Sequence, residues 1–265
     1  MIHPTAVIHP DAQLGAGCSV GPYAVIDAFV VLGADCVVGA HAHLTGHTIA
    51  GARNRFHTGC VIGDAPQDFK YSGAPTRLRI GDDNVFREHV TVNRSTTLDQ
   101  DTELGDGNFF MASCHVGHNS RIGNRNIIAN GAQLAGHVEL ADHAFVSGNC
   151  LVHQFCRVGR LAMMQGGSAI SKDLPPFCIA RGDNALAGLN TVGLRRAGIS
   201  SSERLALRSA YRELFRSGRR LVEAVAAVRA EFAVVGVVLE LADFVVASKR
   251  GVCAVSSRAE ADDEP

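Results

Sequence analysis

Four histidines are the side chains of this sequence best suited to acid–base chemistry. His115 and His118 form a His-x-x-His pair, and His137 and His153 follow them along the chain. An unperturbed imidazole has a pKa near about 6.5, so at neutral pH it can act as a general base. A lone surface histidine has no such role. The interpretation therefore depends on a fold that brings these rings into one region.

An aliphatic residue at every sixth position predicts that fold. The series runs from Ile2 to Ile62, resumes in phase at Ile80 and continues, after one more interruption, to Ile170. A period of six matches neither a helix face nor an alternating strand. It is typical of an all-β left-handed parallel β-helix, in which three short strand-and-turn units make a coil of about 18 residues. About nine to ten coils fit, with the aliphatic side chains inside.

The same register predicts the direction of the histidine side chains. All four fall outside the aliphatic and small-residue positions, so they should point outward. His118 and His137 are 19 residues apart, which is about one coil, and His115 is close to His118. Three imidazoles can therefore line one region of the surface.

Six of the eight cysteines share one position in the repeat, four residues after an aliphatic residue, where other units have Ala or Ser. They are Cys18, Cys36, Cys60, Cys114, Cys150 and Cys156. A free cysteine behaves as a small hydrophobic residue, so this position should be buried. The sequence has no CxxC pair, which argues against a metal site and a disulfide framework, and unpaired thiols are typical of a reducing compartment.

The ends of the repeat suggest the domain organisation. Residues 1–186 should form the β-helix, with loops extruded at 63–79 and 93–103, where binding residues are often found. Residues 187–252 should form an α-helical domain of three helices, and 253–265 an acidic, disordered tail.

The composition argues against several classes of function. The formal net charge is -1 over 265 residues, which gives no general attraction to nucleic acid. The N-terminus lacks a basic region followed by an apolar run, and the apolar stretch 232–246 is too short to span a bilayer. We therefore expect a cytoplasmic protein without a transmembrane segment.

Several motifs within the repeat together carry a resemblance to a known family. They are Gln67–Arg77, His115–His118, Leu134–His137, Val152–Cys156 and Gly193–Gly198. With them, residues 2–250 resemble the acyl-[acyl-carrier-protein]–UDP-N-acetylglucosamine O-acyltransferases, the hexapeptide-repeat transferases that open lipid A biosynthesis. Hexads alone are shared by many transferases, whereas the segment QDFKYSGAPT together with VHQFC is specific.

The resemblance implies an activity, a partner and an assembly. The family transfers an (R)-3-hydroxyacyl group from acyl carrier protein to the 3-position of UDP-N-acetylglucosamine, without a covalent intermediate, cofactor or metal. By position, His118 matches the general base that takes the sugar hydroxyl proton, and Gly136 matches the residue whose N–H stabilises the oxyanion. The family acts as a homotrimer with sites between adjacent solenoids, which would explain why counting coils does not bring Asp68 next to His118.

The other implied roles concern substrate binding. The residues that match substrate contacts are Gln67, Asp68, Lys70, His115, His137, His153, Gln154, Asn190 and Arg196. Arg196 suits a diphosphate because a guanidinium donates through a planar fork. Gly166 matches the position that limits acyl length, and a glycine there suggests room for a long chain.

Three residues depart from the family pattern. Asn119 follows His118 where the family often has Asp, so we expect an oriented but more weakly activated imidazole. Asn93 stands where His is common, and Val192 stands at a position that can hold a nucleotide-contacting Glu. The acceptor atom therefore stays open between a 3-hydroxyl and a 3-amino group.

A row of arginines lies on the first helix predicted for the C-terminal domain, which should begin near Ser201 and end before Gly218. Spaced by four residues, they share one helix face. The arginines are Arg204, Arg208, Arg212 and Arg216, and Arg220 continues the same spacing beyond Gly218. They form either a solvated face paired with nearby glutamates or a dock that steers acidic acyl carrier protein to the enzyme.

Two further classes of function are compatible with the residues alone. Carbonic anhydrases of the γ class use this solenoid with three interface histidines around a metal, which keeps a metal-dependent hydratase open. The other is a non-catalytic sugar-binding solenoid. The segment Gln67–Arg77 and the C-terminal helices argue against the hydratase.

Overall fold

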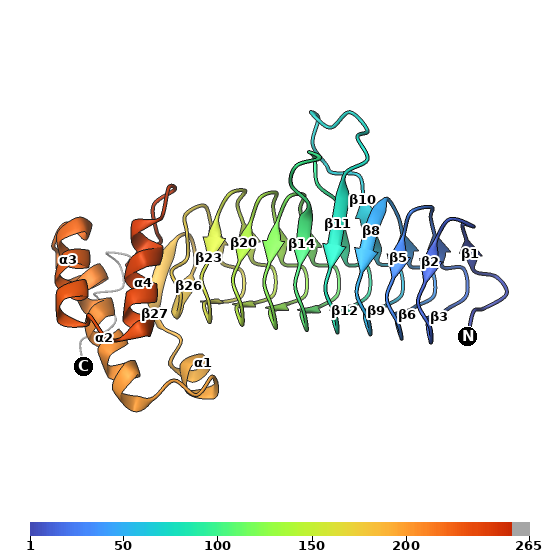
Figure 1. Ribbon diagram of the computed structural model, residues 1–265. Coiled ribbons are helices and arrows are strands. Elements are labelled where there is room, and N and C mark those ends of the chain that lie inside the picture. Colours follow the sequence, from blue (N-terminus) through green and yellow to red (C-terminus); the bar gives the residue numbers. More distant parts are fainter. Residues whose placement is uncertain (256–265) are drawn as a thin grey trace.

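The computed structural model describes residues 1–255, which form a left-handed parallel β-helix followed by a helical domain (Figure 1). Within these residues the strands make three sheets of nine, eight and eleven strands. Consecutive strands along the chain belong to different sheets, and β1 pairs in parallel with β4, one coil later. The predicted fold class is confirmed.

Most strands contain two residues, as a six-residue unit with a tight turn requires. The first sheet contains β1 (Val7–Ile8), β4 (Val25–Ile26), β7 (His43–Leu44), β10 (Val61–Asp64), β13 (Thr91–Asn93), β16 (His115–Val116), β19 (Gln133–Leu134), β22 (Leu151–Val152) and β25 (Ala169–Ile170). The second sheet contains β2 (Gln13–Leu14), β5 (Val31–Leu32), β8 (His47–Ala50), β11 (Arg77–Ile80), β14 (Thr102–Leu104), β17 (Arg121–Ile122), β20 (Glu139–Leu140) and β23 (Arg157–Val158). The third sheet contains β3 (Ser19–Val20), β6 (Val37–Val38), β9 (Arg55–Phe56), β12 (Val85–Phe86), β15 (Phe109–Phe110), β18 (Ile127–Ile128), β21 (Phe145–Val146), β24 (Met163–Met164), β26 (Cys178–Arg181), β27 (Ala185–Leu189) and β28 (Ala254–Val255).

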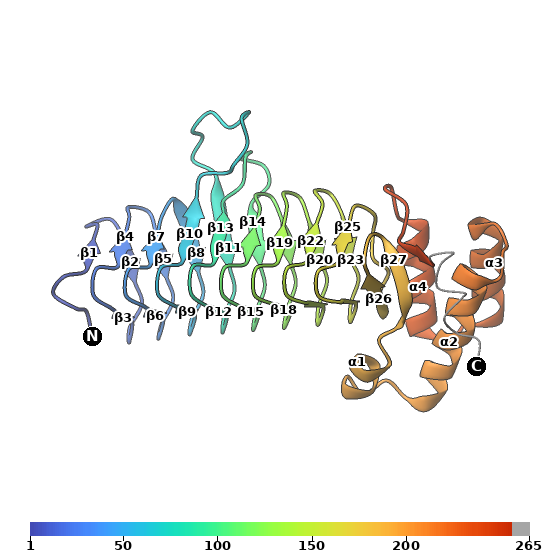
Figure 2. The ribbon, with the colours of Figure 1, turned by 180° about the vertical axis from the view of Figure 1, so that it is seen from behind.

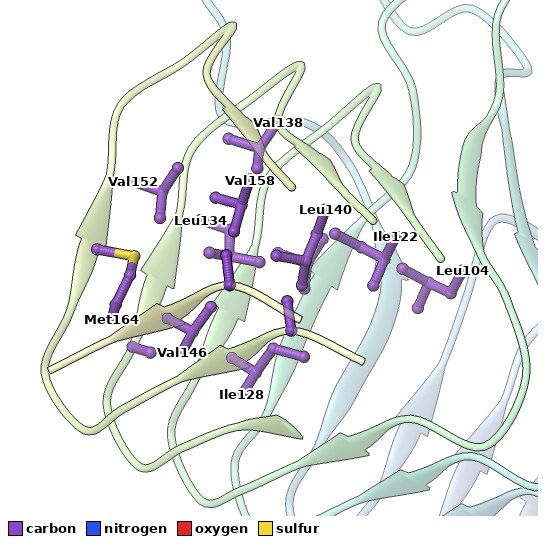
Figure 3. Close-up of a cluster of buried hydrophobic side chains, with 14 of the residues drawn as sticks. Leu104, Ile122, Ile128, Leu134, Val138, Leu140, Val146, Val152, Val158 and Met164 are labelled. Atoms are coloured by element: carbon purple, nitrogen blue, oxygen red, sulfur yellow. The ribbon is translucent and has the colours of Figure 1, made fainter. Parts of the chain in front are cut away.

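The aliphatic side chains at every sixth position fill the interior of the β-helix. In each two-residue strand the second side chain points inward, and Figure 3 shows a set of them from all three sheets meeting around the axis. Leu134 and Val146 have no exposed surface. The first coil is the exception: Ile2 is 54% exposed and Ile8 is half-buried, because a coil packs against them on one side only.

The position predicted to bury cysteines does so. Cys18 in the first coil is half-buried, and the others are fully buried, namely Cys36, Cys60, Cys114, Cys150 and Cys156. All eight thiols are free. They are therefore part of the packed interior and of its junction with the C-terminal segment.

The two extruded loops are shorter than predicted. β10 continues to Asp64 and β11 begins at Arg77, so the first loop comprises residues 65–76, and the second comprises 94–101. The difference arises because β11 pairs along four residues with β8, which extends the strand beyond the two-residue unit. Both loops leave the same edge of the solenoid, at the top of Figure 1.

The helical domain contains four helices among the described residues, one more than predicted. They are α1 (Thr191–Arg196), α2 (Ser201–Arg216), α3 (Leu221–Glu231) and α4 (Gly236–Val246). α1 has six residues, too few to show a helical period in the sequence. α2 begins at the predicted residue because Ser200 and Glu203 form a reciprocal capping box.

The ends of the helical domain differ from the prediction. β27 runs to Leu189, past the boundary expected at residue 186. The tail expected from Cys253 onward is instead ordered at its start, because Cys253 is fully buried and β28 pairs in parallel with β27. The rest of that predicted tail, 256–265, lies outside the described residues. Within residues 1–255 every helix is too short or too polar to cross a bilayer.

Candidate functional site

The site is built at one corner of the solenoid. Each coil turns three times, and we call the turn from the first sheet to the second the first corner; the second and third corners follow in chain order. His118 lies at the first corner after β16, and Gly136 holds the same position one coil later. A Cβ on Gly136 would stand 2.6 Å from both Cε1 and Nε2 of His118, so only glycine leaves room for the imidazole there.

Gly136 also offers a hydrogen-bond donor beside that ring. Within residues 1–255 its N–H makes no hydrogen bond to the protein. Gly136 and His118 line the same cleft. A free backbone N–H and an imidazole side by side are the two groups that acyl transfer requires, a donor for an oxyanion and a base.

The hydrogen bonds of Asn119 determine the tautomer of His118. Asn119, only 1% exposed, holds its Oδ1 2.9 Å from Nδ1 of His118 and 3.0 Å from the backbone N of Thr96. A backbone N–H can only donate, so Oδ1 is the acceptor of both bonds and the Nδ1 of His118 carries the proton. Nε2 therefore keeps its lone pair and can accept a proton from a substrate.

The outer face of the first sheet forms a cleft of about 820 Å³ beside His118, which we call the histidine cleft. Its walls bring together several of the predicted site residues, namely Gln67, His115, His118, Gly136, His153 and Gln154. Thr91 fixes His115, with Oγ1 2.7 Å from Nδ1. Gln67 belongs to the first extruded loop, so that loop reaches the cleft within a single chain. Counting coils missed this because it ignores the length of the loop.

Burial and neighbouring charge act on two of the histidines. Burial, followed by the nearby His118, lowers the pKa of both His115 and His137. The carboxylate of Asp68, in the first loop, acts on the pKa of His137 in the opposite direction. Both rings are therefore neutral at pH 7 and can exchange hydrogen bonds with uncharged substrate groups.

Aromatic contacts fix the orientation of His137. Its ring stands edge-on to that of His118, with 5.2 Å between centroids, and stacks on Phe155 at 4.5 Å. Residues 118, 137 and 155 follow one another on successive coils at the first corner. The outward-pointing rings of His118 and His137 therefore lie together, as the register predicted, because they stand on neighbouring coils.

Sequence reasoning missed the part played by the residues at the base of the second loop. Arg94 donates from Nη1 to the carbonyl of Gly63 at 2.8 Å and from Nη2 to the hydroxyl of Tyr71 at 3.1 Å, which braces the first loop. Asn93, 5% exposed, lines the histidine cleft and donates to the carbonyl of Ala65 at 3.0 Å. The sequence singled out Asn93 as a departure from the family pattern, but the one signal for Arg94 is its place at a break of the repeat.

Comparison with known proteins gives the family. A model described as bacterial transferase hexapeptide (six repeats) matches residues 11–46 and 101–136, and a model described as UDP N-acetylglucosamine O-acyltransferase, domain 2, matches residues 173–253. The curated acyl-[acyl-carrier-protein]–UDP-N-acetylglucosamine O-acyltransferase of Anaeromyxobacter sp. (strain Fw109-5) is 47% identical over 253 residues, covering 95% of this chain and 98% of the relative. That of Myxococcus xanthus (strain DK1622) is 48% identical with the same coverage. The chain belongs to this O-acyltransferase family.

Solved structures agree with this membership in the O-acyltransferase family. The UDP-N-acetylglucosamine acyltransferase from Bacteroides fragilis 9343 superposes with a TM-score of 0.92 at 40% identity, covering 95% of this chain and 99% of that one. The UDP-N-acetylglucosamine acyltransferase from Campylobacter jejuni gives a TM-score of 0.90 at 36% identity, with 97% and 100% covered. The solenoid and the helical domain therefore both belong to the family fold.

Two residues that the O-acyltransferase pattern assigns to the nucleotide lie away from the histidine cleft. Asn190 caps α1, since its Oδ1 accepts from Gly193 N at 2.9 Å and its Nδ2 donates to the carbonyl of Leu161 at 2.9 Å. Leu161 is at the second corner, and Figure 2 shows α1 on the edge opposite the extruded loops. Within one chain, Asn190 and Arg196 are therefore not brought to His118.

Two further predicted residues lie at the margins of the site. Lys70 is exposed in the first loop, where its backbone N donates to Oδ1 of Asp68 at 2.9 Å. Gly166 is exposed at the third corner, just before Ala169, which lines the histidine cleft. A Cβ on Gly166 would meet only the carbonyl of Gly148, at 3.6 Å, so the space beside it is open.

The arginines of α2 separate into two groups. Arg208, Arg212 and Arg216 are exposed, and within residues 1–255 they have no carboxylate within 4.0 Å. Arg204 is half-buried and donates to the carbonyl of Ile199 instead.

Two of the three glutamates expected to neutralise the predicted row of arginines bind elsewhere, whereas Glu223 pairs with Arg220, the last arginine of that row. Glu203 accepts from Ser200, and Glu213 pairs with Arg219. The hypothesis that nearby glutamates pair with the exposed arginines is therefore wrong for Arg208, Arg212 and Arg216.

The described part of a single chain offers no group of three His, Cys, Asp or Glu side chains arranged to hold a metal ion. The outward histidines instead make hydrogen bonds or ring contacts with Thr91, Asn119 and Phe155. A single chain therefore gives no support to the hypothesis of a metal-dependent hydratase.

Proposed function

We propose that the protein transfers an (R)-3-hydroxyacyl group from acyl carrier protein to the 3-hydroxyl of UDP-N-acetylglucosamine, the first step of lipid A biosynthesis, in the cytoplasm. The observation that carries the proposal is the free Nε2 of His118 beside the free N–H of Gly136 in the histidine cleft. Family membership supplies the substrates, since the relatives are named for them. Eight free thiols suit the reducing compartment in which the reaction would take place.

The reaction needs only these groups. Nε2 of His118 takes the proton of the 3-hydroxyl as that oxygen attacks the thioester carbonyl, and a carbon–oxygen bond forms. The negative charge moves to the carbonyl oxygen, which accepts a hydrogen bond from Gly136 N–H, a donor worth about 3 to 4 kcal/mol in comparable sites. Collapse of this intermediate breaks the carbon–sulfur bond, and the leaving thiolate takes the proton back from His118.

The other predicted side chains then bind and orient the sugar. His115, His153, Gln67 and Gln154 line the histidine cleft around the base, and Asp68 and Lys70 belong to the loop above it. Because His115 is neutral at pH 7, it can accept or donate a hydrogen bond without competing for the proton. Gly166 leaves open space before β25, which suits an extended acyl chain.

A homotrimer would complete the nucleotide site. Asn190 and Arg196 lie by the second corner of their own chain, far around the solenoid from the first corner. A three-fold assembly can set the second corner of one chain against the first corner of the next. Arg196 of one copy would then bind the diphosphate of a sugar held by His118 of its neighbour.

Acyl carrier protein is proposed to dock on α2. Arg208, Arg212 and Arg216 present three exposed positive charges that no carboxylate of the described chain neutralises. Unpaired charges of one sign steer an oppositely charged partner. Arg204, at the start of the same helix face, adds its positive charge to this dock.

A 3-amino acceptor is the second candidate for the same site. Asn119 replaces the carboxylate common in the family, so His118 lacks a charged partner at Nδ1. An amine needs less help from a base than a hydroxyl. Incubation with UDP-N-acetylglucosamine and with its 3-amino analogue, followed by mass spectrometry of the products, distinguishes O-acylation from N-acylation.

The proposal is tested on His118 with a matched histidine as control. His118→Ala should lose nearly all turnover of UDP-N-acetylglucosamine while keeping its circular dichroism spectrum, because it removes the imidazole that packs directly against Gly136. His57→Ala removes a half-exposed histidine from an earlier coil and should retain the wild-type rate. More than a tenth of wild-type activity in the His118 variant would remove His118 as the base.

Shared sites are tested by mixing two inactive variants. If His118 and Arg196 act across an interface, trimers reassembled from His118→Ala and Arg196→Ala chains contain some sites with both residues intact. Activity should reappear on mixing. Mixed assemblies that stay as inactive as either parent would show that the two residues do not share a site between copies.

A further inference from the structure

The first corner at the coils of His118 and Gly136 is called the catalytic corner, and a second, smaller cleft adjoins it on the side of the second sheet. It has a volume of about 390 Å³, and we call it the basic cleft. Asn119 and His137 form the wall that it shares with the catalytic corner. Its charged side chains are Arg121, Glu139, Arg157, Asp173, Lys249 and Arg250, so positive charges outnumber negative ones by two.

The cations come from two parts of the chain that are far apart in sequence. Arg121 and Arg157 point outward from β17 and β23, with Glu139 between them on β20. Lys249 and Arg250 follow α4, in the segment that returns to the solenoid beside the last coils (Figure 2). Only the tertiary structure brings these four side chains to one cleft.

Asp173 attaches this returning segment to the solenoid. Its side chain, 2% exposed, accepts from Ser248 Oγ at 2.8 Å, and its backbone N donates to the carbonyl of Gly251 at 2.9 Å. Residues 249 and 250 are therefore held between two anchored positions. Arg250 is fixed further because its Nε donates to the carbonyl of Ser171 at 3.0 Å.

The hydrogen bonds of Arg157 leave part of its guanidinium free. Nε donates to Asp173 at 3.0 Å, Nη2 donates to the carbonyl of Phe244 at 3.0 Å, and the group stacks on the Phe244 ring at 4.3 Å. Nη1 has no acceptor within residues 1–255. Lys249 is exposed, and no carboxylate of the described residues lies within 4.0 Å of it. Arg157 Nη1 and Lys249 are thus the donors of the cleft that lack an anion within the described residues, whereas Arg121 pairs with Glu103 at 3.8 Å.

We propose that the basic cleft binds a phosphate group, namely the phosphodiester that joins the prosthetic arm of the acyl donor to its carrier protein. Fixed guanidinium and ammonium groups are the usual partners of phosphate oxygens. Neutral His137, whose side chain makes no hydrogen bond within residues 1–255, stands in the shared wall as a further donor.

The position of the cleft favours the donor over the acceptor. The histidine cleft, with the first loop above it, takes the sugar under the proposed function, on which this inference rests. The basic cleft lies on the other side of His118, and Ala247 at the end of α4 forms its far wall. It therefore stands between the catalytic corner and the end of α4, in the helical domain that also carries the proposed dock on α2. An arm running from that domain to His118 would cross it.

The test uses donors that differ only in the phosphate. Hydroxyacyl-phosphopantetheine and hydroxyacyl-pantetheine are compared as donors for the full chain, with UDP-N-acetylglucosamine as acceptor. Lys249→Ala should raise KM for the phosphorylated donor by roughly fivefold, since one charged contact is lost, and leave KM for the other donor unchanged. Lys249→Glu should raise it further. Arg55→Ala, which removes an exposed arginine from the third sheet, is the matched control.

Each outcome decides one point. A rise confined to the phosphorylated donor supports the basic cleft as its phosphate site. A rise in KM for UDP-N-acetylglucosamine would assign the cleft to the acceptor diphosphate and overturn the proposal, as would equal KM values for both donors in wild type and variants. Absence of transfer from either donor and from acyl carrier protein would refute the proposed function itself.

Discussion

Replacing Gly136 by alanine tests the geometry of the catalytic corner without removing either catalytic group. The new Cβ would lie 2.6 Å from Cε1 and Nε2 of His118, whereas carbon contacts in proteins are about 3.5 Å or longer. The imidazole must therefore retreat by about 1 Å. The backbone N–H of residue 136 remains, so any loss of rate reports the position of the base.

The expected loss is large in activity and small in stability. A displacement of about 1 Å at a reacting group costs roughly 100-fold in rate, so kcat/KM of Gly136→Ala should fall by about that factor. His118 is only half-buried and can turn outward. The free energy of unfolding should therefore drop by about 1 kcal/mol, the worth of its bond to Asn119.

The assay is acyl transfer to UDP-N-acetylglucosamine followed by mass spectrometry, with urea unfolding alongside. Gly236→Ala is the control, since a Cβ at that residue of α4 meets no atom within 4 Å and should leave kcat/KM unchanged. A Gly136→Ala enzyme within threefold of the wild-type kcat/KM would show that the imidazole seen against Gly136 is not in its reactive position, and the assignment of this corner would fail.

Three other predictions follow from the contacts described. Asn119→Asp adds a carboxylate at Nδ1 of His118, which stabilises the protonated imidazole, so the acidic limb of the pH–rate profile should move to higher pH. An acidic limb at the same pH in both enzymes would mean that protonation of His118 does not control the rate. Burial would raise the pKa of Asp101, but hydrogen bonds from Arg77 and Arg79 outweigh it and hold that pKa below its ordinary value. The resulting stabilisation is present above roughly pH 4 and lost as pH falls further, so Asp101→Asn should unfold about 1 kcal/mol more easily at pH 7, with the difference vanishing in acid; a difference independent of pH would contradict the pairing. The double variant Arg208→Glu and Arg212→Glu should raise KM for acyl carrier protein about tenfold at low salt and spare KM for the nucleotide sugar, whereas an unchanged KM for the carrier would remove α2 as the dock.

The repeat of six was enough to determine the solenoid, because its information is local. Each aliphatic residue packs on those of the coils next to it, so the phase of the series states which side chains lie inside and which outside. The burial of the cysteines and the outward direction of His118 follow from the same count. The capping box at Ser200 is equally local, and it defined the start of α2.

Only the tertiary structure decided which distant groups meet. The phase says nothing about where an extruded loop bends, so the presence of Gln67 beside His118 could not be counted from the sequence. It also says nothing about which corner a later segment packs against. Asn190 is therefore found at the second corner, and Lys249 and Arg250 return to the first through the buried carboxylate of Asp173. Contacts of this kind depend on packing between separate elements, which no periodicity along the chain encodes.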